Sequence, residues 1–87
     1  MQKQQVKELS KEELLQRFGA SVRAHRDARE LTQEQLAELC DLHVTYISQI
    51  ERGLKNLSLF NIYRVALALD VAPGELFGNL LPAHARR

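Results

Sequence analysis

Two short helical patterns joined by a tight turn constrain this fold more than any other feature of the sequence. TQEQ, which begins at Thr32, is a capping box that marks a helix N-terminus, and this helix is expected to end near Cys40. Its buried face is expected to hold Leu36, Ala37 and Leu39. The next helix, HVTYISQIERG, is expected to run over residues 43–53 and to stop at Gly53, which suits a helix C-terminus. Two helices separated by only about three residues form a helix-turn-helix.

Capping signals place three more helices, which makes the predicted fold all-α. SKEE at Ser10 is another capping box, and apolar residues at helical spacing follow it as far as Val22, so a first helix is expected to run to about Ala28. Ser58 is a candidate N-cap for LFNIYRVALALD, and Pro73 fits the first turn of a short last helix, PGELF. The sequence therefore predicts five helices and no strand.

The size and composition of the chain fit a single globular domain. It has 87 residues, of which 45% are hydrophobic and 26% are charged. No apolar run approaches the roughly 18 residues of a membrane span, no secretory signal is evident, and a single Cys fits a reducing compartment, so a cytoplasmic location is expected. The expected division is an N-terminal extension over 1–9, a helix-turn-helix domain over 10–77 and a C-terminal tail over 78–87.

The helix expected over residues 43–53 has two chemically different faces. With Ile47 placed inward and a rotation of about 100° per residue, Ile50 and Glu51 fall on the inward side. The opposite side carries Thr45, Ser48, Gln49 and Arg52. This outward set is mostly uncharged and able to hydrogen-bond, which fits the base edges in a DNA major groove. The alternative is a solvated surface helix that lacks lysine.

Several segments resemble the Cro/C1-type (XRE) helix-turn-helix family. They are LTQEQLAEL, YISQIERG, NLSL and VALALDVAPGELF, and the resemblance covers roughly residues 18 to 77. It implies a five-helix, lambda-repressor-like DNA-binding domain and a transcriptional regulator, a class that includes repressors. TYISQIERG and NLSL, together with the small size of the chain, also resemble the controller proteins of restriction–modification systems.

The resemblance implies which residues meet DNA. The base-reading positions would be occupied by Val44, Thr45 and Gln49, flanked by His43 and Ser48. The phosphate-binding residues would be Gln33, at the N-terminus of its helix, with Arg52 and Lys55 just past the recognition helix.

A structural ion pair between Arg26 and Glu51 is also implied by the resemblance. It would tie the first helix to the recognition helix. The assignment of faces agrees, because it turns Glu51 inward and a buried carboxylate needs a partner. The alternative is that each of the two side chains is separately solvated.

Five residues depart from the family pattern: Glu30, Asp41 and His43, together with His25 at a position where a core Leu is common and Leu57 at a position where Pro is frequent. Glu30 and Asp41 stand where a helix-ending or turn glycine is usual, and a left-handed Glu is expected to cost on the order of 1 kcal/mol. His43 replaces the usual Ser cap of the recognition helix, so that helix is expected to lose its cap. The same substitution would place an imidazole at the DNA, and the preference for one DNA sequence is therefore expected to depend on His43 and Val44.

A second apolar stripe on LFNIYRVALAL predicts an association surface. The residues that can face the core are Leu59, Ile62, Ala66 and Leu69. Phe60, Tyr63 and Leu67 lie on a different face, and Leu80 and Leu81 follow closely in the sequence. An exposed apolar stripe on a small domain is typical of an interface, so a symmetric homodimer is expected. The alternative is that the N-terminal segment or the tail covers this stripe in a monomer.

These features predict a DNA-binding transcriptional regulator rather than an enzyme. Its partners would be double-stranded DNA and a second copy of itself, with the recognition helix in the major groove of a pseudo-palindromic operator. The net charge of +1 does not oppose this, because local clustering of positive charge matters more than the total. Two other functions stay open: an antitoxin that also binds a toxin protein, and a protein-interaction module that has lost DNA binding.

Other chemistry finds little support in the sequence. No nucleophile–base pair, glycine-rich phosphate loop or pair of carboxylates points to catalysis, and no cofactor, membrane or small-molecule ligand is indicated. The three histidines, at 25, 43 and 84, lack metal-ligand spacing. Cys40 is expected to pack in the core, with a redox switch as the alternative.

Overall fold

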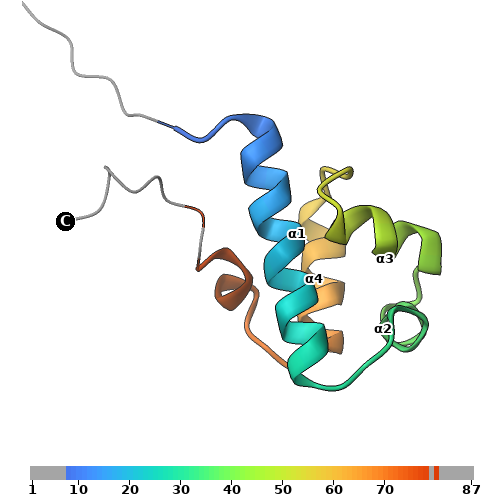
Figure 1. Ribbon diagram of the computed structural model, residues 1–87. Helices are drawn as coiled ribbons and strands as arrows, with labels where there is room; N and C mark the ends of the chain where they lie inside the picture. The colour runs from blue at the N-terminus through green and yellow to red at the C-terminus, as the bar shows by residue number, and fades with distance from the viewer. Residues whose placement is uncertain (1–7, 79, 81–87) are drawn as a thin grey trace, which may run out of the picture.

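The computed structural model describes residues 8–78 and 80, and the regular structure in this part of the chain is entirely helical (Figure 1). Its elements are α1 (Lys11–Ala28), α2 (Gln33–Cys40), α3 (Val44–Glu51), α4 (Leu59–Ala68) and the 3-10 helix η1 (Pro73–Phe77). None of these helices is long and apolar enough to cross a membrane.

The last predicted helix differs from an α-helix. The described residues contain four α-helices, and the segment Pro73–Phe77 forms a 3-10 helix instead of a fifth. Pro73 has no amide hydrogen to donate and Gly74 loses much backbone entropy in a helix, so this short segment is a poor α-helix former. Such short pieces commonly adopt the tighter 3-10 geometry.

Side-chain caps start the helices where the sequence predicts them. The hydroxyl of Ser10 accepts a hydrogen bond from the amide of Glu13 at 3.0 Å, and Thr32 accepts from Gln35 at the same distance. Ser58 accepts from the amide of Asn61 at 3.1 Å. Each bond satisfies an amide that has no partner inside the helix, which explains why local sequence alone locates these ends.

The cap of α3 contradicts the expectation from the sequence. His43 does cap this helix, because its Nδ1 accepts a hydrogen bond from the amide of Thr45 at 3.0 Å. An unprotonated imidazole nitrogen is a good acceptor, and the extended backbone of His43 lets the ring reach the first turn. The substitution for Ser therefore changes the capping group without removing the cap.

Non-glycine residues in the left-handed region end several segments. Glu30 and Asp41 both have φ of 58°, as the missing glycines predict, and Asp70 has φ of 59° although the sequence did not single it out. Asp41 lies in the short connection between α2 and α3, so its left-handed backbone forms part of the tight turn. Gly53, with φ of 77°, follows α3 as predicted.

One hydrophobic core connects the helices. It consists of Phe18, Val22, Leu36, Ala37, Cys40, Ile47, Ile50, Leu57, Val65, Ala66, Leu69 and Leu76. α3 and η1 lie on opposite sides of α1 (Figure 1), while α2 packs against both α3 and α4. α3 is thus held by α1 and α2.

Two leucines expected in the core are exposed. Cys40 is the buried residue at the end of α2, and the buried residues of this helix are Leu36, Ala37 and Cys40. Leu39 faces outward. Leu59 is the first residue of α4, and the buried part of that helix, Val65 and Ala66, lies more than one turn further along. Leu59 therefore adds to the exposed apolar side of α4.

Candidate nucleic-acid interface

α3 shows one side to the core and the other to solvent. Ile47 and Ile50 are almost completely buried. The predicted base-reading residues fall into an exposed pair, His43 and Thr45, and a partly exposed group, Val44, Ser48 and Gln49. Val44 packs in part against the core, so only a portion of its side chain is available to a ligand.

Gly19 brings the backbone of α1 against the C-terminal end of α3. A Cβ atom at Gly19 would collide with the carbonyl oxygen of Ile50 and would lie 2.8 Å from that of Glu51. Only glycine allows this approach, because backbone oxygens cannot move aside as a flexible side chain can. This contact was not predicted from the sequence, although an isolated glycine inside a helical pattern is a known signal of close packing.

A bidentate ion pair joins α1 to α3 at the same place. Arg26 Nε lies 2.7 Å from Glu51 Oε2 and Arg26 Nη2 lies 2.9 Å from Glu51 Oε1. The side chains of Arg26 and Glu51 are only 10% and 3% exposed. The geometry is the fork-to-fork arrangement that makes such pairs strong and directional.

The rest of the Arg26 guanidinium is also satisfied. Its Nη1 donates to the carbonyl of Leu31 at 2.8 Å, where α1 gives way to α2. The hydrogen bond to Glu51 raises the pKa of Arg26 above its ordinary value, while burial acts in the opposite direction. No buried side-chain nitrogen or oxygen of the described residues is left without a hydrogen-bond partner. The charge is therefore buried at a site built to hold it.

Gln33 connects this junction to the start of α2. Its Nε2 donates to Glu51 Oε1 at 3.0 Å, so Glu51 receives bonds from both α1 and α2. An amide nitrogen carries two hydrogens, which leaves one for a phosphate at the N-terminus of α2. The residue predicted to bind phosphate is thus also part of the support for α3.

The predicted phosphate-binding cations follow directly after α3. Arg52 and Lys55 are both exposed. Within α3 itself the only charged side chain is Glu51, whose carboxylate is paired with Arg26. The outward face of this helix is therefore polar and uncharged, with its positive charge placed beyond its C-terminal end.

Two side chains of α4 make polar contacts with the helix-turn-helix, and neither contact was predicted from the sequence. Arg64 Nη2 donates to the carbonyl of Asp41 in the tight turn at 2.9 Å. Asn61 Nδ2 donates to the hydroxyl of Tyr46 in α3 at 3.4 Å. Because the partners are 23 and 15 residues apart, no local pattern could reveal them.

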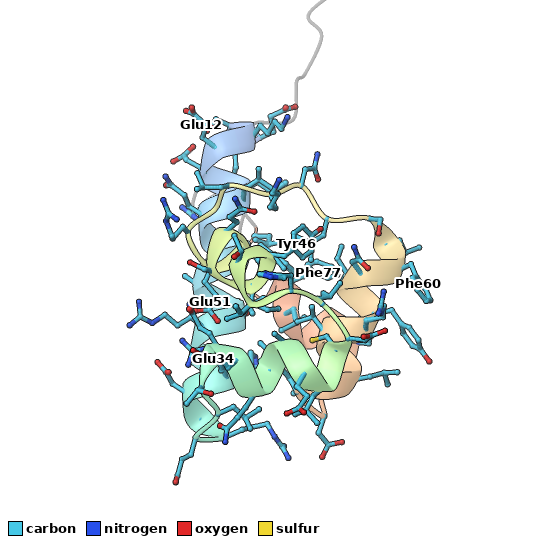
Figure 2. The ribbon with its side chains drawn as sticks, turned by 90° about the vertical axis from the view of Figure 1, so that its right-hand side faces the viewer. Glu12, Glu34, Tyr46, Glu51, Phe60 and Phe77 are labelled. Carbon is cyan, nitrogen blue, oxygen red and sulfur yellow. The ribbon has the colours of Figure 1, made fainter. Side chains whose placement is uncertain are left out.

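α4 also carries an exposed apolar face, which is defined by four side chains. Their exposed fractions are 79% for Leu59, 64% for Phe60, 47% for Tyr63 and 59% for Leu67. Phe60 projects outward from α4 (Figure 2), and the guanidinium of Arg64 lies 5.4 Å from its ring centre. This α4 face contains three of the five residues predicted for a dimer interface.

The other two predicted interface residues have different outcomes. Leu80 is partly buried and lines a small apolar pocket of its own chain together with Leu15, Phe18 and Phe77. Leu81 lies outside the described residues. Of the predicted interface residues that the structure describes, the exposed ones therefore all lie on α4.

Cys40 lies in the core beneath the α4 face. Its side chain is almost completely buried, and it lines a shallow hollow with Leu39, Arg64 and Leu67. Burial raises the pKa of the Cys40 thiol from 9.0 to about 11, although the positive charge of Arg64 opposes this shift. The thiol is thus protonated at neutral pH, as expected of a packing residue.

Comparisons with known proteins agree with this architecture. A family model described as helix-turn-helix (HTH_3) matches residues 22–76. The control protein C.BamHI of Bacillus amyloliquefaciens is 52% identical over 60 residues, which cover 68% of this chain and 74% of that protein.

Solved structures give the same picture. The restriction-modification controller protein C.AhdI from Aeromonas hydrophila is 48% identical with a TM-score of 0.72, over 72% of this chain and 96% of that one. The controller protein C.Esp1396I, solved as a tetramer in complex with its natural 35 base-pair operator, is 33% identical with a TM-score of 0.69. That match covers 74% of this chain and 84% of the other.

Proposed function

The chain belongs to the XRE-type helix-turn-helix family of DNA-binding regulators, and we propose that it is a transcriptional regulator of the restriction–modification controller type that binds operator DNA as a homodimer. The observation that carries this proposal is the outward face of α3. It is polar and uncharged, and a buried junction of Gly19, Arg26 and Glu51 holds it in one orientation. A rigid helix with short hydrogen-bonding side chains suits the direct reading of base edges.

In this proposal α3 enters the major groove and its side chains choose the sequence. Gln49 can bond adenine through both atoms of its amide, and Thr45 and Ser48 can bond several bases. The exposed methyl surface of Val44 suits the methyl group of thymine. His43, at the helix N-terminus, flanks this set.

Phosphate contacts would fix the register of the protein on DNA without choosing a sequence. Gln33 can donate from the N-terminus of α2, and Arg52 and Lys55 can neutralise phosphates past the end of α3. Each neutralised phosphate contributes about 0.9 to the slope of log affinity against log salt concentration. With so few cations at the groove, we expect a shallow slope.

Dimerisation would place two copies of α3 on one face of the DNA. The exposed α4 face, Leu59, Phe60, Tyr63 and Leu67, is the apolar surface that a two-fold partner would cover. Successive major grooves on one face are about 34 Å apart, so the operator would be pseudo-palindromic with half-sites at that spacing.

A binding selection from random duplexes tests the proposal directly. The wild-type protein should enrich a pseudo-palindromic site. Gln49→Ala should lose discrimination at one base pair per half-site, with a loss of about 1–3 kcal/mol against the preferred base. If Gln49→Ala kept every base preference of the wild type, the assignment of α3 as the base-reading helix would be wrong.

Arg52→Ala is the matched control for this experiment. A residue that binds phosphate should weaken binding to all sequences equally and reduce the salt slope by about 1. The two variants lie on the same helix and its C-terminal cap, so a difference between them separates reading of bases from attraction to the backbone.

A further inference from the structure

The cap of α3 selects the tautomer of His43, the residue that precedes the first turn of α3. His43 Nδ1 accepts a hydrogen bond from the amide of Thr45 at 3.0 Å, so Nδ1 carries no hydrogen. A neutral imidazole has one N–H and one bare nitrogen, and the hydrogen must therefore lie on Nε2. The cap has selected one of the two tautomers.

The remaining nitrogen is a donor directed away from the helix. Nε2 lies on the part of the ring farthest from the main chain, and His43 is exposed. None of the described residues accepts a hydrogen bond from it. The N-terminal residues of a recognition helix are those that meet base edges. His43 thus presents one N–H, which can only donate, at the end of the helix where a helix of this kind contacts DNA.

We propose that His43 reads one base in each half-site as an obligate hydrogen-bond donor, with the cap of α3 setting that polarity. This inference rests on the proposed function and deepens it. Guanine offers N7 and O6 as major-groove acceptors, adenine offers N7, and thymine offers O4. Cytosine offers only an amino donor there. His43 therefore discriminates against cytosine at the base it contacts.

The cap is what makes this reading directional. A free histidine could move its hydrogen to Nδ1 and let Nε2 accept from the amino group of cytosine. In this protein the same change would put a hydrogen on the nitrogen that now receives the Thr45 amide, and the first turn of α3 would lose its cap. A serine cap lacks this property, because its hydroxyl both donates and accepts.

Two variants separate capping from reading. His43→Ser keeps an N-cap acceptor, since Ser is among the best capping residues, but removes the distal N–H. His43→Ala removes both. We expect the wild type to disfavour cytosine at one position of each half-site by about fivefold, the value of one hydrogen bond. His43→Ser should accept all four bases there while unfolding like the wild type, and His43→Ala should relax the same position and unfold more easily.

The experiment is a selection from random duplexes with each protein, followed by affinity measurements on four duplexes that differ at the implicated position. If the wild type enriches no sequence, the proposed function fails and this inference falls with it. If the wild type enriches an operator but His43→Ser keeps every preference, only the inference is overturned. A uniform loss of affinity in His43→Ser for all four duplexes would make His43 a phosphate donor and would also overturn it.

Discussion

The junction between α1 and α3 and the outer face of α4 reverse the usual distribution of side chains. The junction buries a charged pair, Arg26 and Glu51, and each charge finds its partner within the same chain. The α4 face exposes large apolar side chains such as Phe60 and Leu67. A buried charge whose hydrogen bonds are all made within one chain needs no further partner. An exposed apolar face, in contrast, is stabilised only when another surface covers it. Changes at the junction should therefore alter folding, and changes at the α4 face should alter association.

The largest effect is expected where α1 touches α3. Gly19→Val would drive a branched side chain into the carbonyl oxygens of Ile50 and Glu51. Because backbone atoms must shift, the free energy of unfolding should fall by about 5 kcal/mol or more, enough to leave much of the protein unfolded. Urea denaturation followed by circular dichroism measures this loss.

Gly74→Ala is the matched control for the close approach. A Cβ atom at Gly74 meets nothing within 4 Å, and its backbone does not require glycine. This variant should be neutral or stabilised by up to about 1 kcal/mol, because alanine restricts the unfolded chain. Equal losses of unfolding free energy in the two glycine variants would contradict the view that the close approach of α3 requires glycine at position 19.

The next largest effect is expected at the buried pair. Glu51→Ala leaves the Arg26 guanidinium buried without its bidentate partner, so unfolding should become easier by about 3–5 kcal/mol. Arg23→Ala removes an exposed ion pair to Asp27 of 3.8 Å and should cost no more than about 0.5 kcal/mol. Thermal unfolding of both variants tests the contrast. Similar melting temperatures would show that the buried Arg26–Glu51 pair contributes no more to stability than the exposed Arg23–Asp27 pair.

A smaller effect is expected at the α4 face, and on a different property. Leu67→Glu places a charge on a surface that the monomer leaves exposed, so unfolding of the monomer should change by no more than about 0.5 kcal/mol. Dimerisation should weaken about 100-fold, which corresponds to about 2.8 kcal/mol. Analytical ultracentrifugation over a concentration series measures the dissociation constant. A destabilised monomer with unchanged association would reverse the roles assigned to the two regions.

The smallest effect is expected at Cys40, which lies in the core beneath the α4 face. Folding raises the pKa of this thiol from 9.0 to about 11, so the folded state holds the proton more tightly. The stability that the protonated thiol contributes is fully present below about pH 8. It declines as the pH rises from 9 to 11, and the free energy of unfolding is lower by about 1 kcal/mol at pH 10. Urea denaturation at pH 8 and pH 10 measures the decline. Cys40→Ala should show a correspondingly smaller change, and an identical change would assign the pH dependence to other groups.

Local chemistry made the helix starts predictable. Ser10, Thr32 and Ser58 each accept a hydrogen bond from the amide three residues further along, so the cause and the effect lie within one turn of sequence. The left-handed conformation of Asp41 was predictable for the same reason, because Asp41 lies where the chain must turn. That of Glu30 was expected only from the resemblance, which implies a glycine at its position. His43 was the exception. Its cap uses a ring nitrogen, and the rule for hydroxyl and carboxylate caps did not include it.

Contacts between helices were much harder to predict. The close approach at Gly19 depends on how α1 crosses α3, and the bond from Arg64 to Asp41 depends on where α4 lies against the turn. Neither is encoded in the spacing of apolar residues. The exposure of Leu59 has the same origin. The spacing of apolar residues predicts which side of a helix faces the core, but it does not predict how far along that side the neighbouring helices extend. The residues assigned to DNA remain predictions, whose test is the selection described above.

The left-handed residues at the helix ends also leave room to raise heat resistance. Glu30 has φ of 58° and an exposed side chain, so it strains the backbone without joining the core. Glu30→Gly would relieve that strain for a gain of up to about 1 kcal/mol, which in a domain this small corresponds to a melting temperature about 4–8 °C higher. The same substitution at Asp41 should gain less stability, because the Asp41 carbonyl already accepts a hydrogen bond from Arg64. A more heat-tolerant variant could therefore be made without altering the outward face of α3 or the α4 face.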